Sequence, residues 1–285
     1  EETKQEGMMQ TSLSKASVLK AMRPSYFLQT KEGAYQGMIK HNLLQNTRAS
    51  VGSSLAFTDL ALQTSKLQKY ATQTGKSVLE YYNLITPRDY EDPVQEKLTL
   101  FTPFLSQFKP QKNLLLQGVN SNANEFIVLN RHKMVVGDYM ALLNMIKPDV
   151  IVSPIEQVTN KCGKRKVGRA IRNAHRTYAD MRQAAQLQNS KLLYPVLYEQ
   201  ADDFFAQLDA DLRGTLDGVM LFNGLENLSL AARFDSVSNL RQSLGDNAII
   251  GTHVNATPLI AAVLSLAGID FFQTDYPLEL ALDGK

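Results

Sequence analysis

Polar side chains follow several apolar stretches of this sequence, at points where a buried strand would end. Three of them are the carboxylates Glu156, Glu199 and Asp275, and one is a histidine, His253. Two carboxylates held together could act as a general acid and a general base, and the histidine could act as a general base. Solvated loop carboxylates and a hydrogen-bonded loop histidine are the ordinary alternatives, and the sequence alone leaves both interpretations open.

The sequence lacks the signatures of several other chemistries. No Walker loop, G-x-S-x-G motif or Ser/His/Asp arrangement is present, and His41, His132 and His175 show no metal-ligand spacing. The single cysteine, Cys162, excludes a disulfide framework and cannot form a structural zinc site alone. We interpret Cys162 as a plain thiol, which is compatible with a reducing compartment.

A cluster of basic residues is the second candidate site, in a chain whose net charge is only +2. If the segment is helical, four arginines at i, i+4, i+7 and i+11 share one face, opposite an apolar stripe that includes Val167, Ile171 and Tyr178. Such a face could contact the phosphates of a nucleic acid, and an ordinary solvated helix surface is the alternative. The whole cluster comprises Lys161, Lys164, Arg165, Lys166, Arg169, Arg172 and Arg176.

The second half of the chain, which has to position these residues, alternates between apolar strands and helices. Its strands are continuous apolar runs, which indicates burial on both faces and a parallel sheet flanked by helices. The absence of a G-x-G-x-x-G motif argues against a doubly wound dinucleotide-binding fold, and 285 residues suffice for a (β/α)8 TIM barrel. We therefore predict an α/β fold of the TIM-barrel type, with strands at 149–154, 192–198, 217–222, 248–252 and 269–274, and helices at 138–146, 164–188, 201–212, 229–244 and 257–267.

The first half is less regular. Residues 1–22 are polar and are interpreted as a loosely held lead-in, and residues 23–285 as the barrel with insertions. A strand is predicted at 25–30 and a helix at 59–74, whereas four prolines make 83–124 look loop-rich. Neither a transmembrane helix nor a signal peptide is predicted. Because both ends of the sequence look cut, we expect it to be a piece of a longer protein.

Collinear segments of the chain resemble the tRNA-guanine transglycosylase family. The block Gly268–Pro277 is similar to the family's signature G-[IV]-D-x-F-D-x-x-x-P-T-R. The order and the spacing of the matches agree over roughly residues 23–285. The shorter matches, in chain order, are Pro24–Gly33, Gly137–Val150, Asp217–Leu221 and Ile249–Gly251.

The same resemblance places unsuitable side chains at the family's catalytic positions. Gln273 occupies the position of the nucleophilic aspartate, and an amide cannot form the glycosyl-carboxylate intermediate. The base-recognition motif F-D-E-C and the purine-binding motif V-Q-G-G have also lost their key residues. They fall at Ile155, Glu156, Tyr198, Glu199 and Gln200, so bulky side chains replace the glycines. The resemblance therefore implies a pocket without catalytic activity.

Eukaryotic members of this family pair a catalytic subunit with a non-catalytic one and exchange guanine for queuine at the wobble position of tRNA. The resemblance implies that this chain is a non-catalytic subunit, which binds the catalytic partner and helps to place tRNA through the basic cluster. It also implies a zinc site in a C-terminal subdomain missing from this chain, and a cytoplasmic location, with peripheral association with the mitochondrial outer membrane in some members.

Two other functions remain open at this point. The first is an active barrel enzyme that uses Glu156, Glu199 or Asp275. The second is a homodimeric scaffold that binds tRNA without a catalytic partner. Base exchange by the purified chain would identify the first, and the proteins that co-purify with it would distinguish the second from a heterodimer.

Overall fold

The computed structural model describes part of the chain. The described ranges are 25–31, 34–35, 51–56, 63–76, 99–103, 117–118, 125–128, 132–155, 163–183, 190–198, 214–222, 225–254 and 256–274, together with residues 60, 78, 201, 205, 276 and 280. The predicted lead-in 1–22 lies outside them, as does most of the predicted helix 201–212.

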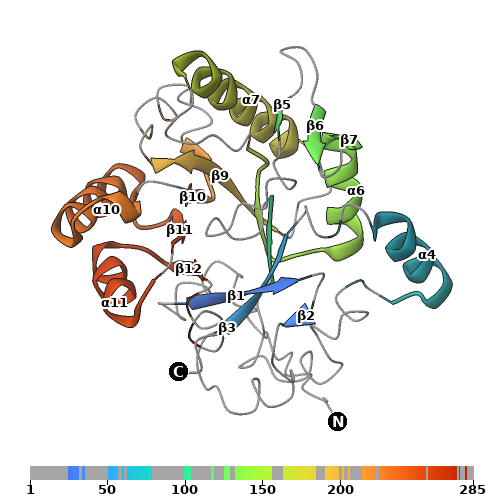
Figure 1. The fold of residues 1–285 in the computed structure, drawn as a ribbon, viewed down its shortest axis with the longest axis horizontal. Coiled ribbons are helices and arrows are strands. Elements are labelled where there is room, and N and C mark those ends of the chain that lie inside the picture. Colours follow the sequence, from blue (N-terminus) through green and yellow to red (C-terminus); the bar gives the residue numbers. More distant parts are fainter. Residues whose placement is uncertain are drawn as a thin grey trace, which may run out of the picture.

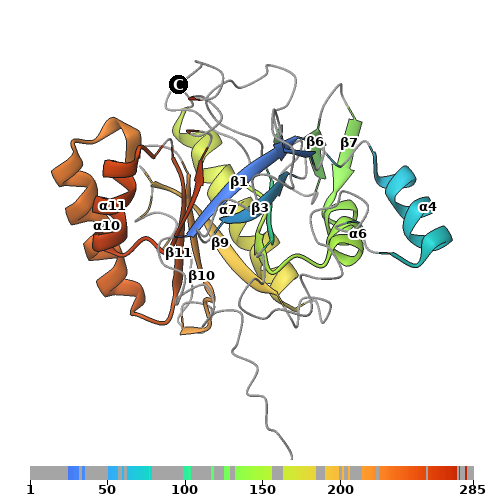
Figure 2. The ribbon, with the colours of Figure 1, turned by 90° about the horizontal axis from the view of Figure 1, so that it is seen from below.

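A parallel β-sheet that closes on itself forms the centre of the fold (Figures 1 and 2). Each strand of the ring pairs in parallel with the next one along the chain, and the last strand pairs in parallel with the first. The chain therefore has a mixed α/β fold with a barrel-like sheet, consistent with a TIM-type barrel. In ring order the strands are β1 (Ser25–Lys31), β3 (Val51–Ala56), β4 (Thr99–Thr102), β8 (Val150–Val152), β9 (Lys191–Leu197), β10 (Gly218–Phe222), β11 (Ile249–His253) and β12 (Phe271–Thr274).

Four further strands lie outside this ring within the described residues. β2 (Ala34–Tyr35) pairs antiparallel with β1. β5 (Gln117–Gly118), β6 (Glu125–Val128) and β7 (His132–Val135) form a small antiparallel sheet of their own. The stretch 83–124, which is interpreted from the sequence as loop-rich, contains β4 and β5, and β4 belongs to the closed ring. Most of the remaining residues of this stretch lie outside the described ranges.

Helices lie on the outside of the ring (Figures 1 and 2). Two of them begin directly after a capping residue, since Ser229 Oγ accepts a hydrogen bond from the Ala232 amide and Thr257 Oγ1 accepts one from the Ile260 amide. The described helices are α4 (Thr64–Thr74), α6 (Val136–Ile146), α7 (Lys164–Gln183), α10 (Leu230–Leu244) and α11 (Pro258–Ala267), with a short 3-10 turn, η6, at Leu225–Asn227.

The start of α6 differs from the prediction. The helix begins at Val136, two residues before the predicted start at 138, so Asp138 lies in its first turn. A carboxylate in the first turn is still favourable, because the amino end of a helix carries partial positive charge.

Aromatic pairs fasten two of the helices to the sheet. Phe101 of β4 lies against Tyr139 of α6 with ring centroids 5.0 Å apart, and the Tyr139 hydroxyl donates a 2.7 Å hydrogen bond to the Val152 carbonyl. Tyr194 of β9 meets Tyr178 of α7 edge to face at 5.1 Å. The first set of contacts holds α6 against the barrel, and the second holds α7. None of the described helices has the length and apolar character needed to cross a membrane.

Candidate functional site: a neutral barrel interior and a basic helix face

The inner face of the barrel is identified by a hydrogen bond that crosses a strand. Gln273 Nε2 of β12 donates to Ser54 Oγ of β3 at 3.0 Å, although β12 and β3 are separated by β1. Such a contact requires both side chains to lie inside the ring. His253 of β11 pairs in register with Gln273, and paired residues of neighbouring strands project to the same face, so His253 lies inside as well.

This inner layer is buried and neutral. Gln273 is 1% exposed and His253 is 4% exposed, and the ring of Phe222 lies 6.1 Å from the imidazole. Burial lowers the pKa of His253 to about 4, so its imidazole is uncharged at neutral pH. His253 Nδ1 and Gln273 Oε1 have no hydrogen-bond partner in the structure as described. The side chains of this inner layer can form hydrogen bonds, but the amide of Gln273 cannot serve as a nucleophile.

The structure differs from the interpretation of His253 as a loop histidine. His253 is the last residue of β11, and its Nδ1 has no hydrogen-bond partner in the structure as described. A base with a pKa of about 4 accepts a proton poorly at neutral pH, so His253 is also badly matched to general-base catalysis in the state described.

The other predicted pocket residues are only partly described. Ile155 is 1% exposed just after β8, and Tyr198 is half-buried just after β9. Both therefore follow the carboxyl ends of neighbouring strands, as predicted. The remaining predicted pocket residues lie outside the described ranges, and the acid pair stays a prediction; these residues are Glu156, Glu199, Gln200 and Asp275.

We expect the buried imidazole to make stability depend on pH. The ordinary pKa of 6.5 applies to the unfolded chain, and the folded pKa is about 4. Between these values the unfolded state binds the proton and the folded state does not, so stability is complete above pH 6.5 and falls as the pH drops towards 4. This effect amounts to about 2 kcal/mol between pH 7 and pH 5.

Urea unfolding of the native chain and of His253→Gln, each at pH 7 and pH 5, measures the effect. Carboxylates contribute equally to both proteins, so the difference between the two pH dependences isolates the imidazole. An identical pH dependence in the two proteins would show that His253 is not buried in its neutral form.

The second predicted site is located on α7, where the amphipathic pattern is confirmed. The apolar stripe of the helix faces the barrel, with Ala170, Ile171, Ala174, Thr177, Tyr178 and Met181 buried and Val167 half-buried. The opposite face carries the basic side chains. Lys164, Arg165 and Arg172 are exposed, whereas Lys166, Arg169 and Arg176 are half-buried. Lys161 and Cys162 lie outside the described residues.

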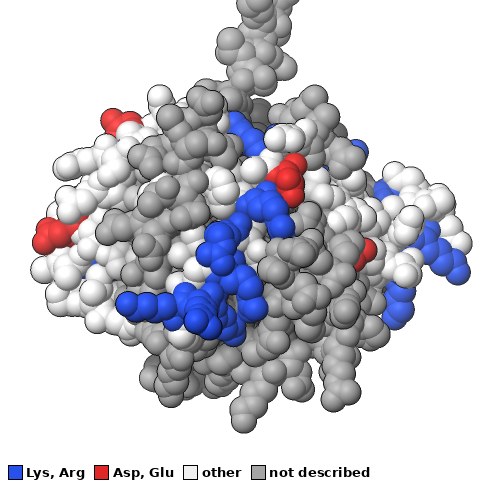
Figure 3. All heavy atoms as spheres, turned by 90° about the horizontal axis from the view of Figure 1, so that it is seen from above, with Lys and Arg blue, Asp and Glu red and all other residues white. Residues whose placement is uncertain are grey.

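Most of the charges on this face have no acidic partner among the described residues. The ion pairs of the described residues are Arg182–Asp217, Lys191–Asp217 and Arg241–Asp270. Five of the six described basic residues of the cluster thus have no ion pair in this part of the chain, and they are Lys164, Arg165, Lys166, Arg172 and Arg176. We call the described cluster from Lys164 to Arg176 the α7 basic stripe. Figure 3 shows it as a continuous row of lysine and arginine side chains over α7.

The direction of the stripe follows from the contacts of α7. At the carboxyl end of the helix, Arg182 Nη1 contacts Asp217 Oδ2 at 2.8 Å, immediately before β10 begins. That end therefore lies at the amino ends of the strands. The stripe occupies the other part of α7 and points towards the edge where the strands end, which is the functional edge of barrels of this type.

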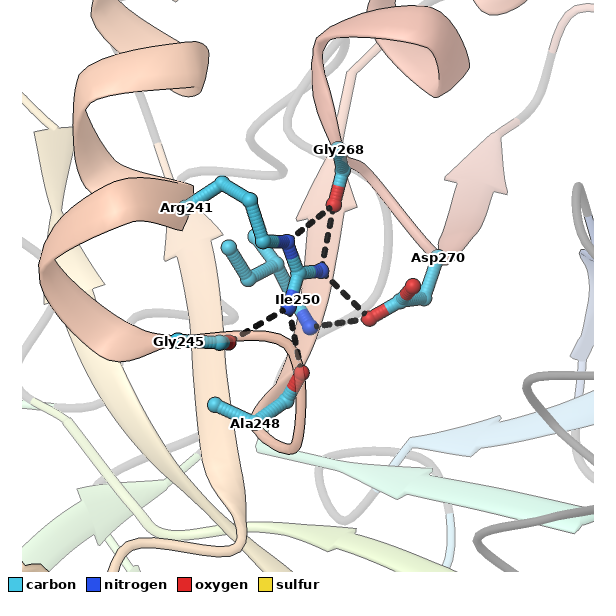
Figure 4. A network of polar contacts seen from close by, with 6 residues as sticks. All are labelled: Arg241, Gly245, Ala248, Ile250, Gly268 and Asp270. Carbon is cyan, nitrogen blue, oxygen red and sulfur yellow. Dashed lines mark hydrogen bonds and ion pairs between the residues drawn. The ribbon is translucent and has the colours of Figure 1, made fainter.

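A largely buried cation that the sequence did not reveal, Arg241, lies at the amino ends of the last strands (Figure 4). Arg241 of α10 donates to the carbonyls of Gly245, Ala248 and Gly268, and its Nη2 lies 2.8 Å from Asp270 Oδ2. The same carboxylate oxygen accepts a 2.8 Å hydrogen bond from the Ile250 amide. Arg241 thereby ties α10 to β11 and β12.

Several residues that carry the family resemblance have structural roles. Asp270 binds Arg241, and a side chain at Gly268 would meet Arg241 atoms at 2.9–3.0 Å. A side chain at Gly251 would overlap the ring of Phe271. The Asp217 carboxylate forms ion pairs with Arg182 and Lys191. These residues lie on the strands or at their amino ends, where recurring residues reflect stability more than chemistry.

Comparisons with known proteins identify no family for this chain. No family pattern matches it, and no curated protein is significantly similar to it. Among the described residues, no group of three or more histidine, cysteine or acidic side chains could hold a metal ion.

Proposed function

We propose that the chain is a non-catalytic tRNA-binding subunit, the accessory partner in a heterodimeric queuine tRNA-ribosyltransferase. The observation that carries the proposal is the α7 basic stripe, of which Lys164, Arg165, Lys166, Arg172 and Arg176 form no ion pair within the described part of a nearly neutral protein. Unpaired cations on one rigid helix suit a polyanion, because each phosphate contact releases a bound counterion.

The barrel interior supports the non-catalytic part of the proposal. Glycosyl transfer through a covalent intermediate needs a carboxylate nucleophile, and the family's position for it is occupied by Gln273. That amide is buried and engaged with Ser54. The catalytic partner would supply the aspartate, and this chain would extend the positive surface that holds the tRNA backbone.

The finer features of the resemblance belong to the same proposal. They are a complete (β/α)8 barrel, a zinc site in a C-terminal subdomain outside this chain, and a cytoplasmic complex that associates with the mitochondrial outer membrane in some members. A pull-down with a catalytic subunit of this family, using the chain extended to include that subdomain, tests the heterodimer directly.

The proposal of a pocket without catalytic activity leads to a prediction about base exchange. We expect neither the chain nor its Gln273→Asp variant to exchange a base by itself. Restoring the carboxylate leaves Tyr198, Glu199 and Ile155 at the positions where the family reads the purine. Incorporation of labelled guanine into tRNA is the measurement. Exchange by the variant above that of a mock preparation would contradict the proposal of a blocked pocket.

The basic stripe leads to a prediction about binding. Changing Arg165, Arg169, Arg172 and Arg176 together to alanine should weaken tRNA binding at low salt and flatten its salt dependence. The slope of log K against log salt should fall by about 0.7–0.9 for each phosphate that the variant no longer neutralises. Fluorescence anisotropy over a salt series measures both quantities, with the catalytic partner present and absent.

A control variant removes the same charge elsewhere. Lys66, Lys69 and Lys76 are exposed on α4 or just after it, and Lys147 is exposed just after α6. The first three are changed to alanine and Lys147 to asparagine, which tolerates the positive φ of 52° at that position. An equal loss of tRNA binding in both variants would show that tRNA responds to the overall charge of the protein and not to the position of the α7 basic stripe.

A further inference from the structure

We infer that the α7 basic stripe binds the backbone of a double-stranded RNA stem, independently of its sequence, and does not bind an unpaired loop. This inference rests on the proposed function, since it names the part of the tRNA that α7 would contact. Three features of α7 carry it: the side chains that its outer face lacks, the fixed spacing of its charges, and its position on the barrel.

The outer face of α7 offers no fully exposed aromatic ring to a base, because the imidazole of His175 is half-buried. The tyrosine of this helix, Tyr178, is fully buried against Tyr194 of the sheet, and the exposed side chains of the described helix are basic, acidic or amide groups. Recognition of single-stranded RNA depends on bases stacking on aromatic side chains, which contributes about 1–3 kcal/mol per base. A face whose exposed side chains are mostly basic and include no aromatic ring forgoes that contribution, and phosphates are the partners that suit it.

The cations are also held in a fixed row. Arg165 and Arg176 are eleven positions apart, which places them about 16 Å apart along the helix axis. The buried stripe anchors α7 to the barrel along the same length, so the row does not have to form when RNA binds. A duplex likewise presents its phosphates in a fixed array, whereas an unpaired strand must be ordered first, with no stacking to offset the cost.

The position of α7 on the barrel is suited to binding a double-stranded RNA stem. The stripe lies on the outer surface of the barrel, away from the inner layer of His253 and Gln273, and it extends from the edge where the strands end towards their amino ends (Figures 1 and 3). A rigid RNA duplex that lies along this surface can contact the whole length of the α7 basic stripe. Backbone contacts of this kind position a nucleic acid without reading its sequence.

Anisotropy with three labelled RNAs tests the inference on the native chain. They are the tRNA, a blunt RNA duplex of unrelated sequence, and an unstructured single strand of the same length as one duplex strand. We expect the duplex to bind several-fold more tightly than the single strand. The four-alanine stripe variant should lose most of its affinity for tRNA and duplex and little of its affinity for the single strand.

Two controls keep the result interpretable. A variant with the same four arginines changed to lysine keeps the charge and should retain most duplex binding, which separates the removal of charge from misfolding. The lysine-depleted variant of α4 and α6 should bind duplex nearly as the native chain does.

The possible failures are distinguishable. If tRNA binding depends on the stripe but the single strand binds as tightly as the duplex, the inference is wrong and the proposed function stands. If tRNA binding does not depend on the stripe at all, both are wrong. A duplex that binds only when its sequence matches a tRNA stem would also overturn the inference, since it would require base contacts.

Discussion

Replacing Arg241 by alanine is expected to lower the free energy of unfolding by about 3–5 kcal/mol. The guanidinium is 11% exposed and Asp270 is 1% exposed, so the change would leave a carboxylate buried without its cation. It would also remove the donor to the carbonyls of Gly245, Ala248 and Gly268. Breaking a buried pair by removing one partner costs far more than the pair contributes in net terms, because the desolvated charge remains.

Urea unfolding monitored by circular dichroism measures this loss. Arg241→Lys is the informative companion, because lysine restores a charge for Asp270 but cannot reach several carbonyls with one planar fork. Its stability should therefore lie between those of the native chain and the alanine variant. Lys66→Ala, at an exposed position on α4, should change stability by less than about 0.5 kcal/mol. A similarly small change in Arg241→Ala would mean that the buried network does not hold α10 to the sheet.

A methyl group at Gly218 should be about as damaging, at about 3 kcal/mol or more. The Cβ of an alanine there would overlap the Ile249 carbonyl oxygen and would lie 2.6 Å from the Ile249 nitrogen. Both atoms belong to the backbone of the neighbouring strand, so no side-chain rotation can relieve the overlap. Relief requires β10 and β11 to separate at the point where their pairing begins.

The matched control for this substitution is Gly163→Ala. Nothing lies within 4 Å of a Cβ built at Gly163, which immediately precedes α7. Thermal unfolding of the two variants compares a crowded glycine with an uncrowded one. Equal melting temperatures would show that β10 and β11 can accommodate a side chain at this point.

The second half of the fold was predictable because its elements are long and chemically distinct. α10 and α11 begin at their capping residues Ser229 and Thr257, and β9 to β12 are apolar runs next to helices with clear breaks between them. Local sequence and tertiary structure agree there, so pattern alone locates most boundaries to within one or two residues.

The first half was less readable because two ring strands carry small or polar residues. β3 contains Ser54, whose hydroxyl faces the barrel interior and accepts a hydrogen bond from Gln273. β4 is only four residues long and has threonine at both ends. Thr99 of β4 is satisfied by the Asp149 carboxylate, which accepts from its amide at 2.8 Å and from its hydroxyl at 2.9 Å. These strands are stabilised by partners about 50 residues or more away, which a local pattern cannot reveal.

The two candidate sites differ in the same way. The basic stripe depends only on helical spacing, so the sequence predicted both the helix and its faces. The neutral inner layer depends on which strands meet across the ring, and the register of His253 with Gln273 is a property of the closed sheet. The sequence placed His253 at a strand end but could not tell that it faces the interior.

The pairing of β1 with β12 has a consequence for how the chain folds during synthesis. Ser25 pairs with Phe271, so the partner of the first strand is made about 250 residues later. At about 5–20 residues per second, β1 leaves the ribosome roughly ten seconds to a minute before β12 exists. During that interval one edge of β1 has unpaired amides and carbonyls that invite pairing with other chains. The ring can therefore close only after β12 has emerged, and the emerging amino-terminal half is where a ribosome-associated chaperone would be needed most.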